Sequence, residues 1–175
     1  MIGYGHMPEK RALHTLYLAL GSNLGDRMDN LRRAVAALAP DICIKEMSPI
    51  YETTPTYVPD QPDFYNVACR AMTHLSPEET LRRLKDIEGA VGRVPGPRFG
   101  PRIVDVDILF YDDLQVNSPE LTIPHARAHE RAFVLVPLSD IAPTRLHPTL
   151  KMTVTTLLER LGDFSHDVRK LEIAL

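Results

Sequence analysis

The sequence is poor in cysteine, and it lacks both a long hydrophobic run and a basic tail. Its two cysteines, Cys43 and Cys69, form neither a disulfide framework nor a CxxC pair. Both lie in apolar stretches, so we expect them to be small core residues. No apolar run approaches the ~20 residues of a membrane span, and residues 1–14 lack the apolar centre of a signal peptide. We therefore expect a cytoplasmic protein with no membrane association.

The charge of the chain argues against a protein that binds nucleic acid through its backbone. The formal net charge is −3 and basic residues form no long run, so generic binding to a nucleic-acid backbone is not expected. The hydrophobic content of 44% and the charged content of 25% are those of an ordinary globular chain. From 175 residues we expect a poorly ordered extension at 1–14, one domain at 15–175, and a monomer or weak homo-oligomer.

Hydrophobic periodicity predicts alternating strands and helices. The predicted strands cover residues 15–20, 42–51, 64–74 and 103–111, and a short hairpin partner is expected after residue 113. The predicted helices begin near residue 26 and after the Ser76 cap, and a last pair is expected at 130–141 and 154–161. The order β-α-β-β-α-β predicts an α+β fold, with one antiparallel sheet, two helices on one face and a C-terminal helical extension.

The strand at 103–111 carries two acidic residues among apolar ones. Alternation predicts that one face presents Val104, Val106, Ile108 and Phe110. The other face then holds Asp105, Asp107 and Leu109, and the two aspartates lie roughly 6.6 Å apart. An isolated pair of this kind is usually a solvated strand face. Aspartate is depleted in strands, however, and two close carboxylates favour a shared cation, for which Mg²⁺ is the natural candidate.

The segment before this strand supplies positive charge. Residues 89–102 contain four glycines, three prolines and three arginines, and no acidic residue. The arginines are Arg93, Arg98 and Arg102, and their guanidinium groups suit phosphate oxygens. A solvated basic loop is the plainer interpretation of each arginine taken singly. Next to a pair of metal-binding carboxylates, they indicate phosphoryl transfer.

Four motifs carry a resemblance to a known family. They are ALGSNLG at 19–25, DQPDFYN at 60–66, RFGPRIVDVDIL at 98–109 and LTIPH at 121–125. In this order, across about residues 16–143, they resemble 6-hydroxymethyl-7,8-dihydropterin pyrophosphokinases. The resemblance implies a ferredoxin-like fold and an enzyme of folate biosynthesis. It also implies transfer of pyrophosphate from ATP to the pterin hydroxymethyl group, release of AMP, and two Mg²⁺ ions.

The same resemblance assigns residues to roles. The metal ligands are Asp105 and Asp107, and the catalytic set adds Arg93 and Arg102. The nucleotide contacts are Lys85, Glu88, Arg93, Arg102, Ile108, Thr122, His125 and Arg131. The pterin contacts are Thr53, Thr56, Phe64, Asn66, Phe99 and Phe133, with Phe64 and Phe133 as aromatic walls. Residues 21–23 are interpreted as a turn and helix entry whose amides could also face ligand.

The chain departs from the family pattern at a few positions. Pro95, Phe99, Ala126 and Glu120 stand where other residue types are common, which bears on ATP affinity and loop closure. No general base is evident, and proton removal by a metal or by Asp107 stays open.

Two alternative functions are kept. A nucleotidyltransferase also combines a Gly-Ser turn with Asp-x-Asp, but here Gly21 and Asp105 lie far apart in sequence. A ferredoxin-like ligand-binding module without activity is the second, and the dense cluster of arginines and aspartates argues against it.

Overall fold

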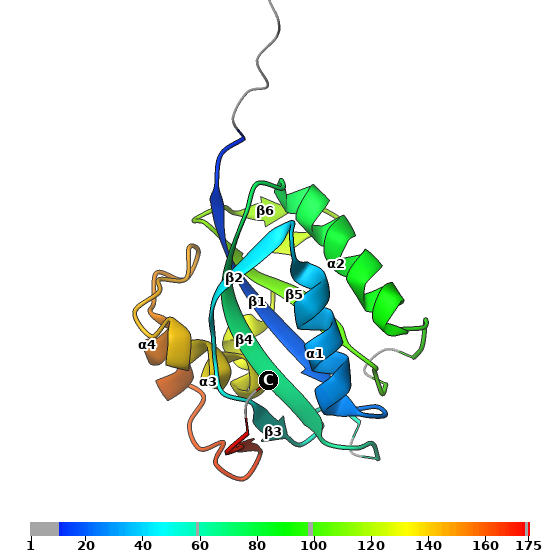
Figure 1. The fold of residues 1–175 in the computed structure, drawn as a ribbon. Helices are drawn as coiled ribbons and strands as arrows, with labels where there is room; N and C mark the ends of the chain where they lie inside the picture. Colours follow the sequence, from blue (N-terminus) through cyan, green and yellow to red (C-terminus); the bar gives the residue numbers. More distant parts are fainter. Residues whose placement is uncertain (1–10, 59, 98–99, 174) are drawn as a thin grey trace, which may run out of the picture.

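A six-stranded antiparallel sheet forms the centre of the computed structural model, which describes residues 11–58, 60–97, 100–173 and 175. The strands are β1 (His14–Ser22), β2 (Ile42–Met47), β3 (Tyr51–Thr53), β4 (Phe64–Thr73), β5 (Asp105–Tyr111) and β8 (Val168–Lys170). Their order is β5-β1-β4-β3-β8, and β2 pairs with β4 beside β3 (Figure 1). The order β5-β1-β4-β2 interlocks two split βαβ units, which confirms the predicted ferredoxin-like class.

Helices cover both faces of the sheet. On one face lie α1 (Arg27–Leu38) and α2 (Pro77–Val91), whose apolar stripes join the side chains of β1 in one core. On the other face, α3 (Ala132–Ile141) and α4 (Val154–Glu159) pack against β4 and β5 in a second core. A short 3₁₀ turn, η1 (Ala128–Glu130), precedes α3. The C-terminal extension is therefore the layer that covers the face opposite α1 and α2.

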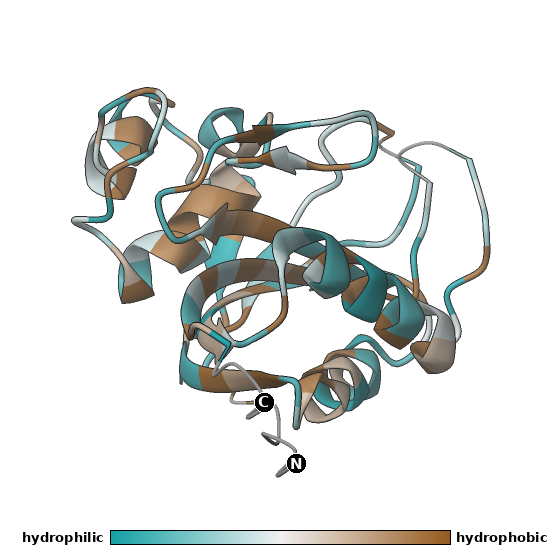
Figure 2. Ribbon diagram, turned by 90° about the horizontal axis from the view of Figure 1, so that it is seen from above, coloured by the Kyte–Doolittle hydropathy of each residue, from teal (hydrophilic) through white to brown (hydrophobic). Residues whose placement is uncertain are grey.

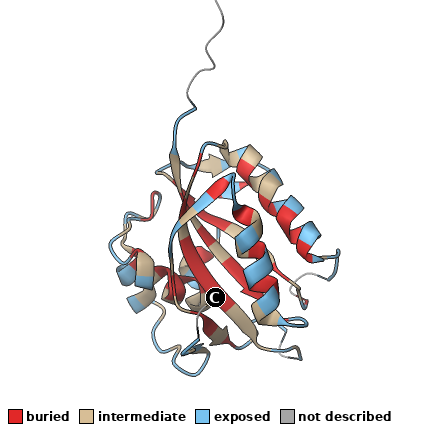
Figure 3. Cartoon of the chain, in the orientation of Figure 1, coloured by how far each residue is buried: buried red, intermediate tan, exposed pale blue. Residues whose placement is uncertain are grey.

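Burial follows these two cores. In Figure 3 the central strands are mostly red, while α1 and α2 carry pale-blue positions on their outer sides. Figure 2 shows the strands largely brown, between helices that alternate brown and teal. No helix within the described part of the chain is both long and apolar enough to cross a membrane.

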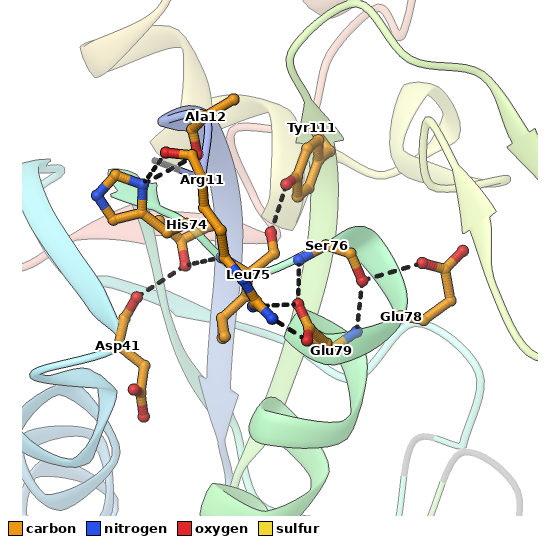
Figure 4. Close-up of polar contacts among 10 residues, drawn as sticks. Arg11, Ala12, Asp41, His74, Leu75, Ser76, Glu78, Glu79 and Tyr111 are labelled. Carbon is orange, nitrogen blue, oxygen red and sulfur yellow. Dashed lines mark hydrogen bonds and ion pairs between the residues drawn. The ribbon is translucent and has the colours of Figure 1, made fainter. Parts of the chain in front are cut away.

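The start of α2 shows why the helix begins where the sequence predicts. The Ser76 hydroxyl accepts the Glu79 N–H at 3.2 Å, and the Glu79 carboxylate accepts the Ser76 N–H at 2.7 Å. This capping box satisfies backbone donors that the first turn leaves free. The chain before β1 joins it, because Arg11 contacts Glu79 at 3.1 Å and its carbonyl lies 3.0 Å from His74 Nδ1 (Figure 4). Residues 1–10 of the expected extension lie outside the described residues.

A β-bulge corrects the predicted alternation of β5. Tyr17 pairs with Phe110 but Leu18 pairs with Ile108, so Leu109 is an extra residue opposite β1. The extra residue reverses the faces that follow it. Phe110 therefore packs in the α3 core with Leu109, and the prediction that it shares a face with Val104, Val106 and Ile108 is wrong. Asp105 and Asp107 precede the bulge, so their shared face is kept.

Three further expectations differ from the structure. The strand predicted at 42–51 is two strands, β2 and β3, separated at Ser48 and Pro49, where proline has no N–H for a ladder. The expected hairpin partner of β5 is wrong, because β6 (Val116–Asn117) pairs with β7 (Thr122–Ile123) in a separate two-stranded sheet. Cys69 is buried as expected. Cys43 is exposed, because its side chain alternates with those of Ile42 and Ile44, which face the α1 and α2 core, and so points to the other face of β2.

Candidate active site

A cleft of about 290 Å³ opens where β1 and β3 end and where β4 and β5 begin. It gathers segments that are far apart in the sequence. Its lining includes most of the predicted site residues, namely Thr53, Thr56, Phe64, Asn66, Lys85, Arg93, Arg102, Asp105, Asp107, Arg131 and Phe133. Phe99 lies outside the described residues. The volume is near the lower end of the range for small-molecule sites, about 300–1,000 Å³.

The two carboxylates lie at the start of β5, two residues apart, so their side chains are on the same face of the strand. Asp105 lies opposite Gly21 and Asp107 opposite Ala19 in the pairing with β1. Val106 between them is 1% exposed and points into the α1 and α2 core. Burial raises the pKa of Asp105, and the neighbouring Asp107 carboxylate raises it further. Positive charge close to this pair is therefore stabilising.

Two arginines supply that charge within the protein. Arg102 Nε lies 3.0 Å from Asp105 Oδ2, and Arg93 contacts the same carboxylate through Asp105 Oδ1. Both guanidinium groups lower the pKa of Asp105 and partly offset the effect of burial. Arg93 and Arg102 are themselves largely covered, with 22% and 23% of their side chains exposed. The acid pair and the basic pair thus form one cluster.

Glu88 stands behind this cluster. Its side chain is 2% exposed, and it lies 2.6 Å from Arg93 Nη1 and 2.9 Å from Lys85 Nζ. It also accepts the backbone N–H of Val106 at 2.8 Å, which ties α2 to β5. The carboxylate is enclosed by protein groups. Glu88 therefore positions Arg93 and Lys85, and its predicted contact with the nucleotide stays a prediction.

Besides Glu88, three predicted nucleotide residues are absent from the lining of the cleft. Ile108 is 5% exposed, and its side chain belongs to the α1 and α2 core. Thr122 and His125 line a second cavity of about 310 Å³ beside β6 and β7. His125 Nδ1 accepts the Arg127 N–H at 3.1 Å, which leaves Nε2 to carry the proton of the neutral ring. Burial lowers the pKa of His125, although the Asp107 carboxylate opposes that shift.

The other half of the cleft is built around an amide. Asn66 is 8% exposed and donates from Nδ2 to Thr53 Oγ1 at 2.7 Å. Gly21 lies across the β1–β4 pairing, and a Cβ there would come within 2.7 Å of Asn66 Oδ1. Glycine therefore leaves room for this amide. Phe64 and Phe133 line the same cleft from β4 and α3.

The sequence alone assigns no role to Tyr57 or to the side chain of Asn23. Tyr57 lines the cleft, and its hydroxyl accepts from Arg131 Nε at 3.3 Å. Asn23 is 1% exposed and bonds to both loops that border the cleft. The signal for Asn23 was present, since an amide in the motif at 19–25 had no stated duty. Tyr57 had no such signal, because an aromatic residue in a proline-rich loop has many plain uses.

The described residues contain no group of three or more His, Cys, Asp or Glu side chains that could hold a metal ion alone. The donor set at the cleft is two carboxylates, Asp105 and Asp107. That set fits Mg²⁺, which proteins usually bind through one or two carboxylates together with water and substrate phosphates. A metal that arrives with a phosphorylated substrate agrees with these residues.

Comparison with known proteins gives a family match over residues 17–143, to 7,8-dihydro-6-hydroxymethylpterin-pyrophosphokinase. The chain is 43% identical to the 2-amino-4-hydroxy-6-hydroxymethyldihydropteridine pyrophosphokinase of Bacillus subtilis, covering 71% of this chain and 76% of that protein. It is 44% identical to the folic acid synthesis protein FOL1 of Dictyostelium discoideum, covering 81% of this chain. The chain spans 22% of the length of the Dictyostelium protein.

Solved structures share the fold. The HPPK-DHPS protein of Plasmodium falciparum, in a triple mutant with STZ-DHP, aligns with a TM-score of 0.77 at 17% sequence identity. The alignment covers 94% of this chain and 48% of that chain. At this level of identity the likeness concerns the arrangement of helices and strands.

Proposed function

Because this chain belongs to the 7,8-dihydro-6-hydroxymethylpterin-pyrophosphokinase family, we propose that it transfers pyrophosphate from ATP to 6-hydroxymethyl-7,8-dihydropterin. The products are AMP and the pterin methyl diphosphate, in folate biosynthesis. The observation that supports this most is one cleft that joins Asp105, Asp107, Arg93 and Arg102 to the buried amide of Asn66. The first group suits a polyphosphate and the second suits a heterocycle with amide edges.

Magnesium is part of the proposal. Asp105 and Asp107 are the residues that would hold it, as two Mg²⁺ ions with ATP as the co-substrate. When bound, the metal neutralises negative charge on the polyphosphate and fixes its orientation. The raised pKa of Asp105 agrees with a carboxylate that is incompletely compensated by its own protein.

The arginines have two sets of partners in this mechanism. Arg93 and Arg102 both contact Asp105. If Asp105 held a cation, both guanidinium groups would be available to phosphate oxygens. Glu88 holds Arg93 and Lys85 at the cleft wall. Phosphoryl transfer depends mostly on positioning and electrostatic stabilisation, so charged groups that are already in place before the reaction favour it.

The pterin side orients the attacking hydroxymethyl group. Phe64 and Phe133 stack on the heterocycle, and the amide of Asn66, braced by Thr53, pairs with its polar edge. Thr56, in the adjoining loop, is a further contact to the pterin. The hydroxymethyl oxygen then faces the β-phosphorus for in-line attack, and AMP leaves.

The remaining nucleotide contacts follow from charge and tautomer. Lys85 and Arg131 line the cleft with positive charge, and Lys85 is held there by its ion pair with Glu88. His125, neutral and protonated on Nε2, donates a hydrogen bond to a phosphate. Thr122 contacts the nucleotide beside it, and Ile108 does so through its backbone, since its side chain is in the core.

The direct test is chromatography of nucleotides after incubation with ATP, Mg²⁺ and the hydroxymethyl dihydropterin. We expect AMP and pterin diphosphate in equal amounts, no AMP without pterin, and loss of turnover with a chelator that added Mg²⁺ reverses. Release of free pyrophosphate would indicate nucleotidyl transfer and would contradict the proposal. Pterin binding without any turnover of ATP would instead support a binding module.

A further inference from the structure

The second cavity, of about 310 Å³ beside β6 and β7, has two histidines in its lining whose polar atoms are incompletely used. His147 Nε2 and His129 Nδ1 are both buried and have no hydrogen-bond partner among the described residues. The centroids of the two rings lie 6.0 Å apart. We infer that this cavity binds a small neutral molecule with an amide or lactam group, whose C=O accepts from His147 and whose N–H donates to His129.

The backbone around His147 decides which of its nitrogens carries the proton. Nδ1 accepts the N–H of Thr149 at 3.3 Å and the N–H of Leu150 at 3.2 Å. Both bonds need the lone pair of Nδ1, so the proton of the neutral ring is on Nε2. The side chain is 5% exposed, and its ring packs edge-on against Phe110. His147 therefore presents a fixed, buried donor that lacks an acceptor.

His129 presents the opposite group. Its Nε2 lies 3.6 Å from Glu130 Oε1, and a carboxylate on that side favours the proton on Nε2. The buried Nδ1 then has an unused lone pair. A donor and an acceptor thus stand at neighbouring positions of one cavity. Buried polar groups are almost always hydrogen-bonded in native proteins, so a ligand that satisfies both is favoured.

The same tautomers argue against two other kinds of ligand. A metal ion binds imidazole through an unprotonated nitrogen, and His147 presents Nε2–H. The described residues also contain no group of three or more side chains that could hold a metal ion. An anion would need compensating charge, and the described lining of this cavity contains no lysine or arginine. A neutral ligand is what remains.

The rest of the lining suits an organic molecule. Val116, Ile123 and Leu150 supply apolar surface, and Gln115 and Asn117 supply further amide groups. A single bridging water occupies only about 30 Å³ and would leave most of the cavity unfilled. A planar lactam can reach both histidines with one edge and place its carbon ring against the apolar side chains.

This site is separate from the proposed active site. The cavity and the cleft share no described lining residue. His147, Thr149 and Leu150 all follow residue 143, where the family match ends. The inference therefore does not rest on the proposed function. Thr122 and His125 also line the cavity, so the test includes a nucleotide as a competitor.

The test uses 2-pyridone, a planar lactam, and the full chain. Titration is followed by NMR through the imidazole nitrogen signals of His129 and His147. We expect saturable binding in the millimolar range that suits so small a ligand, with shifts at both rings. N-methyl-2-pyridone keeps the ring and the C=O but has no N–H, so we expect it to bind at least about 5-fold more weakly. Equal binding of the two probes, or no saturable shift with either, would overturn the inference.

Variants assign the binding to the two histidines. His147→Asn keeps an acceptor for the Thr149 N–H but removes Nε2–H, and His129→Phe keeps a ring but removes the acceptor. We expect each to weaken binding of 2-pyridone at least about 5-fold. His74→Asn is the matched control, because His74 is exposed and contacts the Arg11 carbonyl instead. An equal loss in the control would count against the assignment. The comparison of the two probes needs only the wild-type protein, so it decides the question if a variant does not fold.

A last titration separates this cavity from the cleft. We expect saturating Mg²⁺ and α,β-methylene-ATP to change the dissociation constant of 2-pyridone by less than about 2-fold, below the range of usual couplings. Displacement of the probe would place it in the nucleotide site and would overturn the inference, while the proposed function would stand. Absence of AMP formation in the turnover assay would overturn the proposed function and leave binding of the probe unaffected.

Discussion

The position of the β-bulge in β5 decides whether Asp105 and Asp107 lie on the same face of the strand. They share a face of β5 because the bulge at Leu109 comes after them. The alternation predicted from the sequence therefore holds where the site needs it. It fails three residues after Asp107, at Phe110, where only packing is affected.

Removal of one carboxylate tests this face. We expect Asp107→Asn to lower kcat/KM on the order of 10²–10³-fold, because a fixed charge that serves the transition state is lost. The change is isosteric and the residue is partly exposed, so the free energy of unfolding should move by less than about 0.5 kcal/mol. Asp113→Asn is the control, since Asp113 is 86% exposed and pairs with Arg145. Activity near wild type in Asp107→Asn would contradict the proposed role.

Residues 21–23 show that a large separation along the sequence does not imply a large separation in space. Gly21 lies far from Asp105 in the chain, and this separation spoke against a nucleotidyltransferase. In the sheet, Gly21 is the direct partner of Asp105. The family match, and not the separation, is what distinguishes the two functions.

At the scale of elements, α2 and β5 are joined through Glu88. This carboxylate accepts the Val106 N–H and pairs with Arg93 and Lys85. Glu88 therefore links α2, which covers one face of the sheet, to β5, which carries Asp105 and Asp107. The charge of the cleft and the packing of the helix depend on the same side chain.

Glu88→Ala tests this link. The variant leaves the buried Val106 N–H without its acceptor and leaves the Arg93 guanidinium with Asp105 alone, so we expect a loss of about 2–3 kcal/mol in the free energy of unfolding. Urea denaturation measures it. The control is Glu46→Ala, which breaks the exposed pair with Arg70 and should cost less than about 1 kcal/mol. Equal losses in the two variants would show that Glu88 is an ordinary surface acid.

At the scale of the whole molecule, the two cores stand on opposite faces of one sheet. The second core includes Phe110, and His147 packs edge-on against that ring at 5.6 Å between centroids. His147 is 5% exposed, and its Nδ1 accepts the N–H of Thr149 and of Leu150 at 3.3 and 3.2 Å. Burial lowers the pKa of His147, and the nearby His129 lowers it further.

The pH dependence of unfolding follows from this shift. Because the folded protein holds His147 neutral, the unfolded chain binds more protons below the ordinary value of 6.5. Its contribution to stability is therefore complete above 6.5 and is lost as the pH falls through the lowered value. We expect the wild-type protein to lose stability between pH 7 and pH 5 by denaturant titration. His147→Asn, which keeps an acceptor for the turn and does not titrate there, should lose less. A parallel decline in both proteins would contradict this.

The sequence by itself determined the local elements and the chemical type of the site. Caps and apolar periodicity located α1 and α2, and alternation located the two carboxylates, because these depend on neighbours within a few residues. The four motifs identified the family, and the match at residues 17–143 confirms it. The same motifs assigned the site residues, and those roles stay predictions.

Tertiary structure decided what depends on pairing between distant segments. It brought Gly21, Asn66 and Asp105 together by placing β1 between β4 and β5. It added β8 to β3, inserted the bulge in β5, enclosed Glu88 behind Arg93 and set Asn23 between two loops. None of these follows from local propensity, because sheet register and burial are fixed only when strands far apart in the chain meet.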